Sequence, residues 1–128
     1  MKYLPVDILQ SFMQEVFIKL GVPEEEAQIC SDVLIASDLK GIESHGIGRL
    51  KMYYDRIKAG IQNPVTNIDV IRDKYATAVW DGNNGMGQVI SKKAMQTAID
   101  KAKEYGLGAI AVRNSTHFGI CGYYAEMA

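Results

Sequence analysis

The 128-residue sequence lacks the long apolar run and the charge excess that mark several protein classes. No stretch reaches the roughly 18 consecutive apolar residues that a transmembrane helix requires. Its 14 basic and 15 acidic side chains leave a net charge of −1, without the basic surface of a nucleic-acid binder or the strong charge of a disordered chain. With 48% hydrophobic residues, the sequence indicates a soluble globular domain that binds neither membranes nor nucleic acids.

Cysteine and histidine are also scarce, with two of each. Cys30 and Cys121 form no Cys-x-x-Cys pair, so we expect two free thiols and a reducing compartment. His117 lies four residues before Cys121, yet no compact cluster supplies the further ligands that zinc needs, so no metal site is expected. The first ten residues contain Pro5 and Asp7 and no uninterrupted apolar stretch of the secretory type, which favours a cytoplasmic protein.

Hydrophobic periodicity predicts three helices in the first part of the chain. Residues 5–20 carry apolar side chains at helical spacing. Residues 23–39 begin with three glutamates, which suit the positive end of a helix. A third helix is expected over residues 44–59, with Ser44 as its N-cap. A glycine follows each of the three patterns within two residues and is typical of a helix end.

After residue 62 the hydrophobic period changes to two, which is typical of strands. Two short strands are expected over residues 68–72 and 75–80, joined by a hairpin turn at Asp73–Lys74. We place a boundary at this change of period. It divides the chain into a helical N-terminal segment, residues 1–62, and the start of an α/β domain, residues 63–128.

A glycine-rich turn, a helix and an apolar strand follow the hairpin, over residues 81–87, 88–105 and 107–112. A strand, a helix and a strand of the buried, parallel type form a βαβ unit. Residues 123–128 resemble the opening of another helix, and no stop signal follows them. The prediction is an α/β fold, apparently truncated, in which a three-helix segment is followed by a hairpin and a βαβ unit.

His45 and Arg49 lie one helical turn apart at the expected start of the third helix, so their side chains can project from the same face. An imidazole and a guanidinium at a helix N-terminus can hold a carboxylate or a developing oxyanion. In the alternative interpretation, Ser44 only caps the helix, while the histidine and the arginine are solvated.

His117 follows the apolar strand, and loops at the carboxyl ends of parallel strands are where α/β proteins place ligands. A histidine there is a candidate acid or base, because its ordinary pKa lies near neutrality. The alternative is a loop histidine that is hydrogen-bonded to the backbone. Ser44 and Ser115 lie in no Gly-x-Ser-x-Gly elbow, so nucleophilic serine chemistry is not expected.

The glycine-rich turn has glycines at positions 82, 85 and 87, in the order Gly-x-x-Gly-x-Gly. The dinucleotide-binding fingerprint requires Gly-x-Gly-x-x-Gly, so the turn does not indicate a Rossmann site. Close packing of a helix on a strand explains these glycines more simply than a phosphate contact does.

Three motifs stand out when they are taken together. The first contains Asp38-x-x-Gly41-Ile42-x-Ser44-His45-Gly46-x-x-Arg49, with Tyr53 or Tyr54 after it, the second is Asp81-Gly82-x-x-Gly85-x-Gly87, and the third is Val112-x-Asn114-Ser115-x-His117-Phe118-Gly119-x-x-Gly122-Tyr123. In this combination they resemble the malate/L-lactate dehydrogenase family of non-Rossmann enzymes. That family includes ureidoglycolate, sulfolactate and diketogulonate enzymes and piperideine-carboxylate reductases.

The resemblance implies an NAD- or NADP-dependent oxidoreductase that interconverts a small anionic 2-hydroxy acid and a 2-oxo acid and that forms a homodimer. The catalytic residues that it implies are Ser44, His45, Arg49 and His117, with either histidine as the proton donor. The cofactor-binding residues that it implies are His45, Thr116, Phe118, Gly119 and Gly122.

Enzymes of this family are much longer than this sequence. The resemblance therefore implies the N-terminal portion of a larger non-Rossmann dehydrogenase fold. The alternative is a truncated, catalytically inactive module that folds by self-association.

Overall fold

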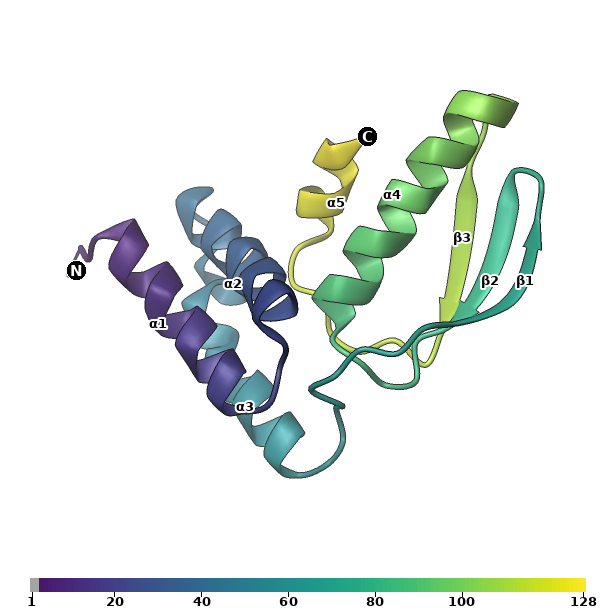
Figure 1. Ribbon diagram of the computed structural model, residues 1–128. Helices are drawn as coiled ribbons and strands as arrows, with labels where there is room; N and C mark the ends of the chain where they lie inside the picture. The colour runs from purple at the N-terminus through teal and green to yellow at the C-terminus, as the bar shows by residue number, and fades with distance from the viewer. Residues whose placement is uncertain (1–2) are drawn as a thin grey trace.

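The computed structural model describes residues 3–128, which form a group of helices beside a small sheet (Figure 1). The helical part comprises α1 (Val6–Lys19), α2 (Glu24–Leu39), two 3₁₀ turns, η1 (Glu43–His45) and η2 (Ile47–Arg49), and α3 (Leu50–Lys58). The second part comprises β1 (Asp69–Lys74), β2 (Thr77–Asp81), α4 (Gly87–Tyr105), β3 (Ala109–Arg113) and α5 (Cys121–Met127). The predicted α/β class is confirmed.

One apolar core joins the two parts. Phe17 of α1, Leu34 of α2 and Tyr53 of α3 are buried in it, and Met86 and Val89 at the start of α4 belong to the same cluster. Burial of these apolar side chains in the shared cluster holds the helices together. Because α4 contributes to this core, the sheet is attached to the helical part at the end of α4 where the glycine-rich turn lies.

The third helix begins at Leu50 and not at Ser44, whose side chain makes no capping hydrogen bond. Gly46 has an extended backbone, with φ −89° and ψ −145°, and divides the segment into two 3₁₀ turns. The carboxylate of Asp38 in α2 accepts a hydrogen bond from the backbone N–H of Ile47, the first residue of the second turn, at 2.8 Å. The predicted serine cap was therefore wrong, since a residue of the preceding helix provides the hydrogen bond.

The predicted hairpin and βαβ unit are confirmed, because β1 pairs antiparallel with β2 and β2 pairs parallel with β3 across α4. The turn, however, lies at Tyr75–Ala76, and the prediction of Asp73–Lys74 was wrong. Tyr75 takes a left-handed φ of 51°. Lys101 of α4 donates a hydrogen bond to its carbonyl oxygen and forms an ion pair with Asp73. This contact from a distant helix stabilises a turn that local propensity does not indicate.

β3 lies at one edge of the sheet, whose strand order is β1-β2-β3. Its residues alternate between exposed and half-buried, so the prediction of a fully buried strand was wrong for the described residues. Ile110 and Val112 face an open groove beside α4. Ala109 and Ala111 face the opposite side of the sheet and are exposed. Among the described residues, none covers the free edge of β3 or this face of it. Strands of parallel sheets are normally buried on both faces, and β3 is not.

Asp81, at the end of β2, connects the two parallel strands. Its carboxylate accepts hydrogen bonds from the backbone N–H of Asn83 at 2.9 Å, from Asn114 Nδ2 at 3.0 Å and from Arg113 Nε at 2.7 Å. These hydrogen bonds, chiefly that from Asn83, lower the pKa of the Asp81 carboxyl group. The loop that carries His117 therefore starts from a fixed position beside the end of β2.

The glycine-rich turn packs against that same loop. A Cβ atom on Gly87 would lie 2.4 Å from the carbonyl oxygens of both Thr116 and His117. A Cβ atom on Gly82 would lie 3.1 Å from the carbonyl oxygen of Asn114. All three glycines of the turn are closely packed, as predicted, but not by a helix on a strand: Gly82 and Gly87 face the loop after β3, and Gly85 faces Thr66, whose Cγ2 would lie 3.0 Å from an added Cβ atom.

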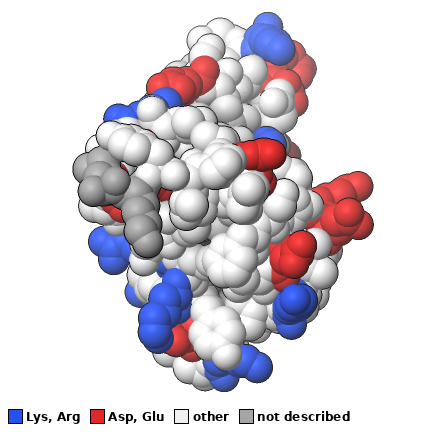
Figure 2. Space-filling view, turned by 90° about the vertical axis from the view of Figure 1, so that its left-hand side faces the viewer, with Lys and Arg blue, Asp and Glu red and all other residues white. Residues whose placement is uncertain are grey.

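The side of the molecule on which α1 lies carries acidic and basic side chains scattered around a broad uncharged area (Figure 2). On α1, Ile8 is 59% exposed and Phe12 is 54% exposed.

Among the helices that the structure describes, none has the length and apolar character needed to cross a membrane.

Candidate active site

The two histidines of the chain lie side by side. The ring centroids of His45 and His117 are 5.7 Å apart, and the ring planes are inclined by 19°. His45 ends η1, between α2 and α3, whereas His117 lies in the loop between β3 and α5. Both side chains are half-buried. The fold thus brings two candidate acid/base residues from distant segments into one site.

Ser44 and Arg49 surround His45 as the sequence predicted, but on 3₁₀ turns in place of an α-helix. Ser44 Oγ lies 2.9 Å from His45 Nδ1. Arg49 Nε donates a hydrogen bond to the carbonyl oxygen of Ser44 at 2.6 Å. No described residue hydrogen-bonds to the terminal guanidinium nitrogens of Arg49, which therefore remain able to bind an anion.

Asp38 and Gly46 position this segment, and sequence reasoning did not include them among the site residues. A Cβ atom on Gly46 would lie 1.7 Å from Asp38 Oδ1, so only glycine lets the carboxylate approach the turn. The other carboxylate oxygen accepts the N–H of Ile47. The sequence signal for this role was the fixed spacing of Asp38 and Gly46 within the first motif.

Tyr53 is a third residue that was not among the predicted site residues. Its hydroxyl oxygen lies 2.6 Å from His117 Nδ1, and the two rings meet edge to face with centroids 5.6 Å apart. Tyr53 is fully buried, whereas Tyr54 is 43% exposed. The motif contained both tyrosines without distinguishing them, because a sequence pattern does not show which of two neighbours turns inward.

The electrostatic environment of His117 disfavours its charged form. Burial is the main cause that lowers the pKa of His117, and the positive charges of His45, Arg49 and Arg56 lower it further. No described carboxylate hydrogen-bonds to either histidine or to Arg49. The site consequently combines a neutral imidazole with a nearby guanidinium, which suits an anionic ligand.

Thr116 holds the loop against the rest of the fold. Its Oγ1 accepts hydrogen bonds from the backbone N–H of Gly87 at 2.9 Å and from Gln62 Nε2 at 3.0 Å. The same hydroxyl donates to the carbonyl oxygen of Gly85 at 2.7 Å. A hydroxyl group has one proton and two lone pairs, so these three bonds use its full capacity. The hydroxyl group of Thr116 therefore has no hydrogen-bonding capacity left for a ligand.

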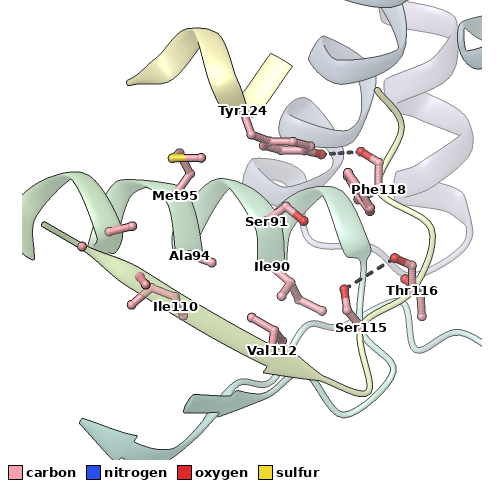
Figure 3. A pocket seen from close by; sticks show the side chains of 13 residues that line it. Ile90, Ser91, Ala94, Met95, Ile110, Val112, Ser115, Thr116, Phe118 and Tyr124 are labelled. Carbon is pink, nitrogen blue, oxygen red and sulfur yellow. Dashed lines mark hydrogen bonds between the residues drawn. The ribbon is translucent and has the colours of Figure 1, made fainter. Parts of the chain in front are cut away.

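An apolar groove of about 550 Å³ lies between α4, β3 and α5 (Figure 3). Thr116 and Phe118 line this groove, whereas His117 between them stacks on His45. Tyr124 of α5 lies at one end of the groove and donates a hydrogen bond to the carbonyl oxygen of Phe118 (Figure 3). Of the residues for which a cofactor role was predicted, Thr116 and Phe118 therefore line the groove, whereas His45 lies against His117.

Gly119 and Gly122 differ in whether the surrounding structure requires a glycine at that position. Gly119 has a left-handed φ of 79°, and a Cβ atom on it would lie 2.6 Å from Val33 Cγ1. Gly122 lies in the first turn of α5, which begins at Cys121, two residues before the predicted position. A Cβ atom on Gly122 would meet no atom within 4 Å. Packing within the described residues thus explains Gly119 but not Gly122.

Both cysteines are free thiols, with Cys30 buried and Cys121 exposed. No three side chains of His, Cys, Asp or Glu in residues 3–128 converge to hold a metal ion.

The family model for malate/L-lactate dehydrogenases matches residues 4–128. The chain belongs to the malate/L-lactate dehydrogenase family. The resemblance carried by the three motifs is confirmed, and the match covers both the helical part and the sheet.

Several relatives of this family are similar over nearly the whole chain. L-Sulfolactate dehydrogenase from Methanocaldococcus jannaschii is 50% identical over 127 residues, which are 99% of this chain and 35% of that enzyme. Malate dehydrogenase from Pyrococcus abyssi is 53% identical over 125 residues, which are 98% of this chain and 34% of that enzyme. The solved structure of malate dehydrogenase from Pyrococcus horikoshii OT3 matches with a TM-score of 0.97 and 50% identity, over 99% of this chain and 36% of that one. The chain thus spans about a third of the length of these relatives.

Proposed function

We propose that the chain forms the N-terminal part of an NAD- or NADP-dependent oxidoreductase that interconverts a 2-hydroxy acid and a 2-oxo acid. The observation that carries this proposal is the stacked pair of His45 and His117 beside Arg49. A 2-oxo acid presents a carboxylate next to a carbonyl group. Its reduction requires a cation for the first group and a proton donor for the second. The names of the relatives, malate and L-sulfolactate dehydrogenases, support the same substrate class.

The residues of the chain perform three tasks in this proposal. The terminal nitrogens of Arg49 bind the carboxylate of the substrate, and the imidazoles of His45 and His117 contact the oxygen of its 2-oxo group. Ser44 Oγ holds the ring of His45 through Nδ1. As the carbonyl group becomes a hydroxyl group, a histidine supplies the proton. The nicotinamide cofactor, when bound, supplies or accepts the hydride.

In this proposal the nicotinamide cofactor binds at Gly122. The space in front of this glycine is open, so the backbone there can approach a ligand closely. Gly119 serves the cofactor indirectly in this proposal, because its left-handed backbone shapes the loop between Phe118 and Gly122. Thr116 acts likewise, through the three hydrogen bonds of its hydroxyl group.

We also propose a homodimer located in the cytoplasm. The dimer follows from the family resemblance, and the two free thiols suit a reducing compartment. Sedimentation and a titration with NADH and NADPH, carried out on the full-length protein and on the 128-residue chain, test this proposal and the inactive module. A uniform oligomer of the 128-residue chain that binds neither cofactor favours the module.

The test of activity is the oxidation of NADH or NADPH by the full-length protein with a panel of 2-oxo acids that includes oxaloacetate, pyruvate and sulfopyruvate. We expect turnover with at least one of them. His45→Gln and His117→Gln should each lower kcat by about a hundredfold, the usual size of an acid/base contribution. The exposed Lys51→Gln is the matched control and should leave kcat unchanged. Absence of turnover with every 2-oxo acid would refute the proposal.

A further inference from the structure

Two groups meet Nδ1 of His117. Besides the hydroxyl group of Tyr53 at 2.6 Å, the backbone N–H of Gly119 points at the same atom from 3.3 Å. A backbone N–H can only donate a hydrogen bond. In the neutral ring this N–H favours Nδ1 as the nitrogen that carries no proton, and the hydroxyl group of Tyr53 can then donate a second and shorter hydrogen bond to it.

Tyr53 is held in place for this contact. Its ring is fully buried and packs edge to face against Phe17 of α1, with centroids 6.0 Å apart. Burial raises the pKa of Tyr53 above its ordinary value, so the phenol keeps its proton at neutral pH. The tyrosine comes from α3 and the histidine from the loop after β3, so the contact sets the ring of His117 relative to a different part of the fold.

We propose that Tyr53 is a positioning residue that keeps His117 in the tautomer with its proton on Nε2. This inference rests on the function proposed above. In that tautomer Nε2 offers a hydrogen bond to the substrate oxygen and has no lone pair with which to act as a base. His117 then polarises the carbonyl group, as a neutral imidazole donor, without losing its own proton.

The proton balance of the reduction assigns the second histidine its task. The carbonyl carbon gains the hydride, and the carbonyl electron pair moves to oxygen. The oxygen takes its proton from the imidazole of His45, while the Nε2–H of His117 stays in place. A transfer from Nε2 of His117 would instead leave its remaining proton on Nδ1, directly opposite the N–H of Gly119.

The neighbouring tyrosine provides a matched control. Tyr53→Phe removes one oxygen atom and keeps the ring that packs on Phe17. Tyr54→Phe makes the same chemical change on the same helix, but at an exposed ring. The ammonium group of Lys58 lies 6.0 Å from the centroid of that ring. Thermal unfolding of the two variants checks that both are folded.

The deciding measurement is the tautomer of His117 in the full-length protein, labelled with ¹⁵N-histidine, from long-range ¹H–¹⁵N correlation spectra at a pH where the ring is neutral. His117→Gln assigns its signals. We expect an unprotonated Nδ1 and a protonated Nε2 in the wild type and in Tyr54→Phe, and a mixture of tautomers in Tyr53→Phe. A protonated Nδ1 in the wild type overturns the proposal, as does a Tyr53→Phe spectrum identical to that of the wild type.

Kinetics give a second readout. Loss of one hydrogen bond that orients His117 should lower kcat of Tyr53→Phe by about tenfold, with the KM of the 2-oxo acid nearly unchanged. Tyr54→Phe should keep both values. If neither the wild type nor any variant reduces a 2-oxo acid, the proposed function fails. The NMR spectra still decide whether Tyr53 sets the tautomer of His117.

Discussion

The carboxylate of Asp38 occupies the space that a side chain on Gly46 would need. A Cβ atom at position 46 would lie 1.7 Å from Asp38 Oδ1, while Oδ2 accepts the N–H of Ile47. This pair determines the path of the backbone between His45 and Arg49. The spacing of the first motif therefore reflects the geometry of a turn as much as the chemistry of the residues on it.

Gly46→Ala should disrupt this turn. The added methyl group displaces the carboxylate of Asp38, so we expect the free energy of unfolding to fall by about 1–3 kcal/mol. Displacement of His45 should lower kcat/KM by about a hundredfold. Gly48→Ala is the control, because its Cβ atom would meet only the carbonyl oxygen of Glu43 at 3.8 Å. Urea unfolding and steady-state kinetics measure both effects, and equal behaviour of the two variants would contradict the role of Gly46.

Arg49→Gln should raise the pKa of His117 toward its ordinary value. Burial remains, but one of the positive charges that oppose protonation is removed. An NMR titration of the full-length protein measures the change, with Lys51→Gln as a control that alters an exposed ion pair. An unchanged or lower pKa in Arg49→Gln would show that the guanidinium does not act on this ring.

The same shift predicts how stability depends on pH. The pKa of His117 lies below the value of 6.5 for the free side chain, so the folded protein binds this proton less readily than the unfolded chain does. His117 therefore contributes stability above pH 6.5 that is lost as the pH falls through its lowered pKa. In Arg49→Gln this loss should be smaller, because the two pKa values are closer.

Thr116→Val should destabilise the loop that carries His117. The variant leaves the N–H of Gly87 and the amide of Gln62 without their acceptor, and we expect a cost of about 2–4 kcal/mol in the free energy of unfolding. Thr116→Ser keeps the hydroxyl group and should lose much less. Denaturant unfolding compares the two variants, and similar losses would mean that the methyl group, not the hydrogen bonds, matters.

Alanine at Gly119 and Gly122 should separate a structural role from a cofactor role. Gly119→Ala places a side chain on a left-handed backbone and against Val33, so we expect a loss of about 1–3 kcal/mol in the free energy of unfolding. Gly122→Ala meets no atom within 4 Å and should leave stability intact. It should instead raise the KM for the nicotinamide cofactor, since the methyl group enters the space proposed for it. An unchanged KM would exclude Gly122 from the cofactor site.

Local sequence patterns were sufficient where a segment folds on its own periodicity. The helices α1, α2 and α4 lie within one or two residues of their predicted bounds, because apolar spacing and a following glycine mark them. Local patterns failed where a distant residue decides the conformation. Asp38 replaces Ser44 as the cap of a turn, and Lys101 supports a hairpin turn at Tyr75.

The sequence by itself identified the family of this protein, and the motifs containing His45, Arg49 and His117 predicted an acid/base site for an anionic substrate. Only the tertiary structure decided that the two imidazoles stack and that Tyr53, not Tyr54, contacts Nδ1 of His117. These contacts join α3, the 3₁₀ turns and the loop after β3, and their relative positions depend on the shared core. That core is the sum of many weak packing interactions between distant residues, which no local stretch of sequence records.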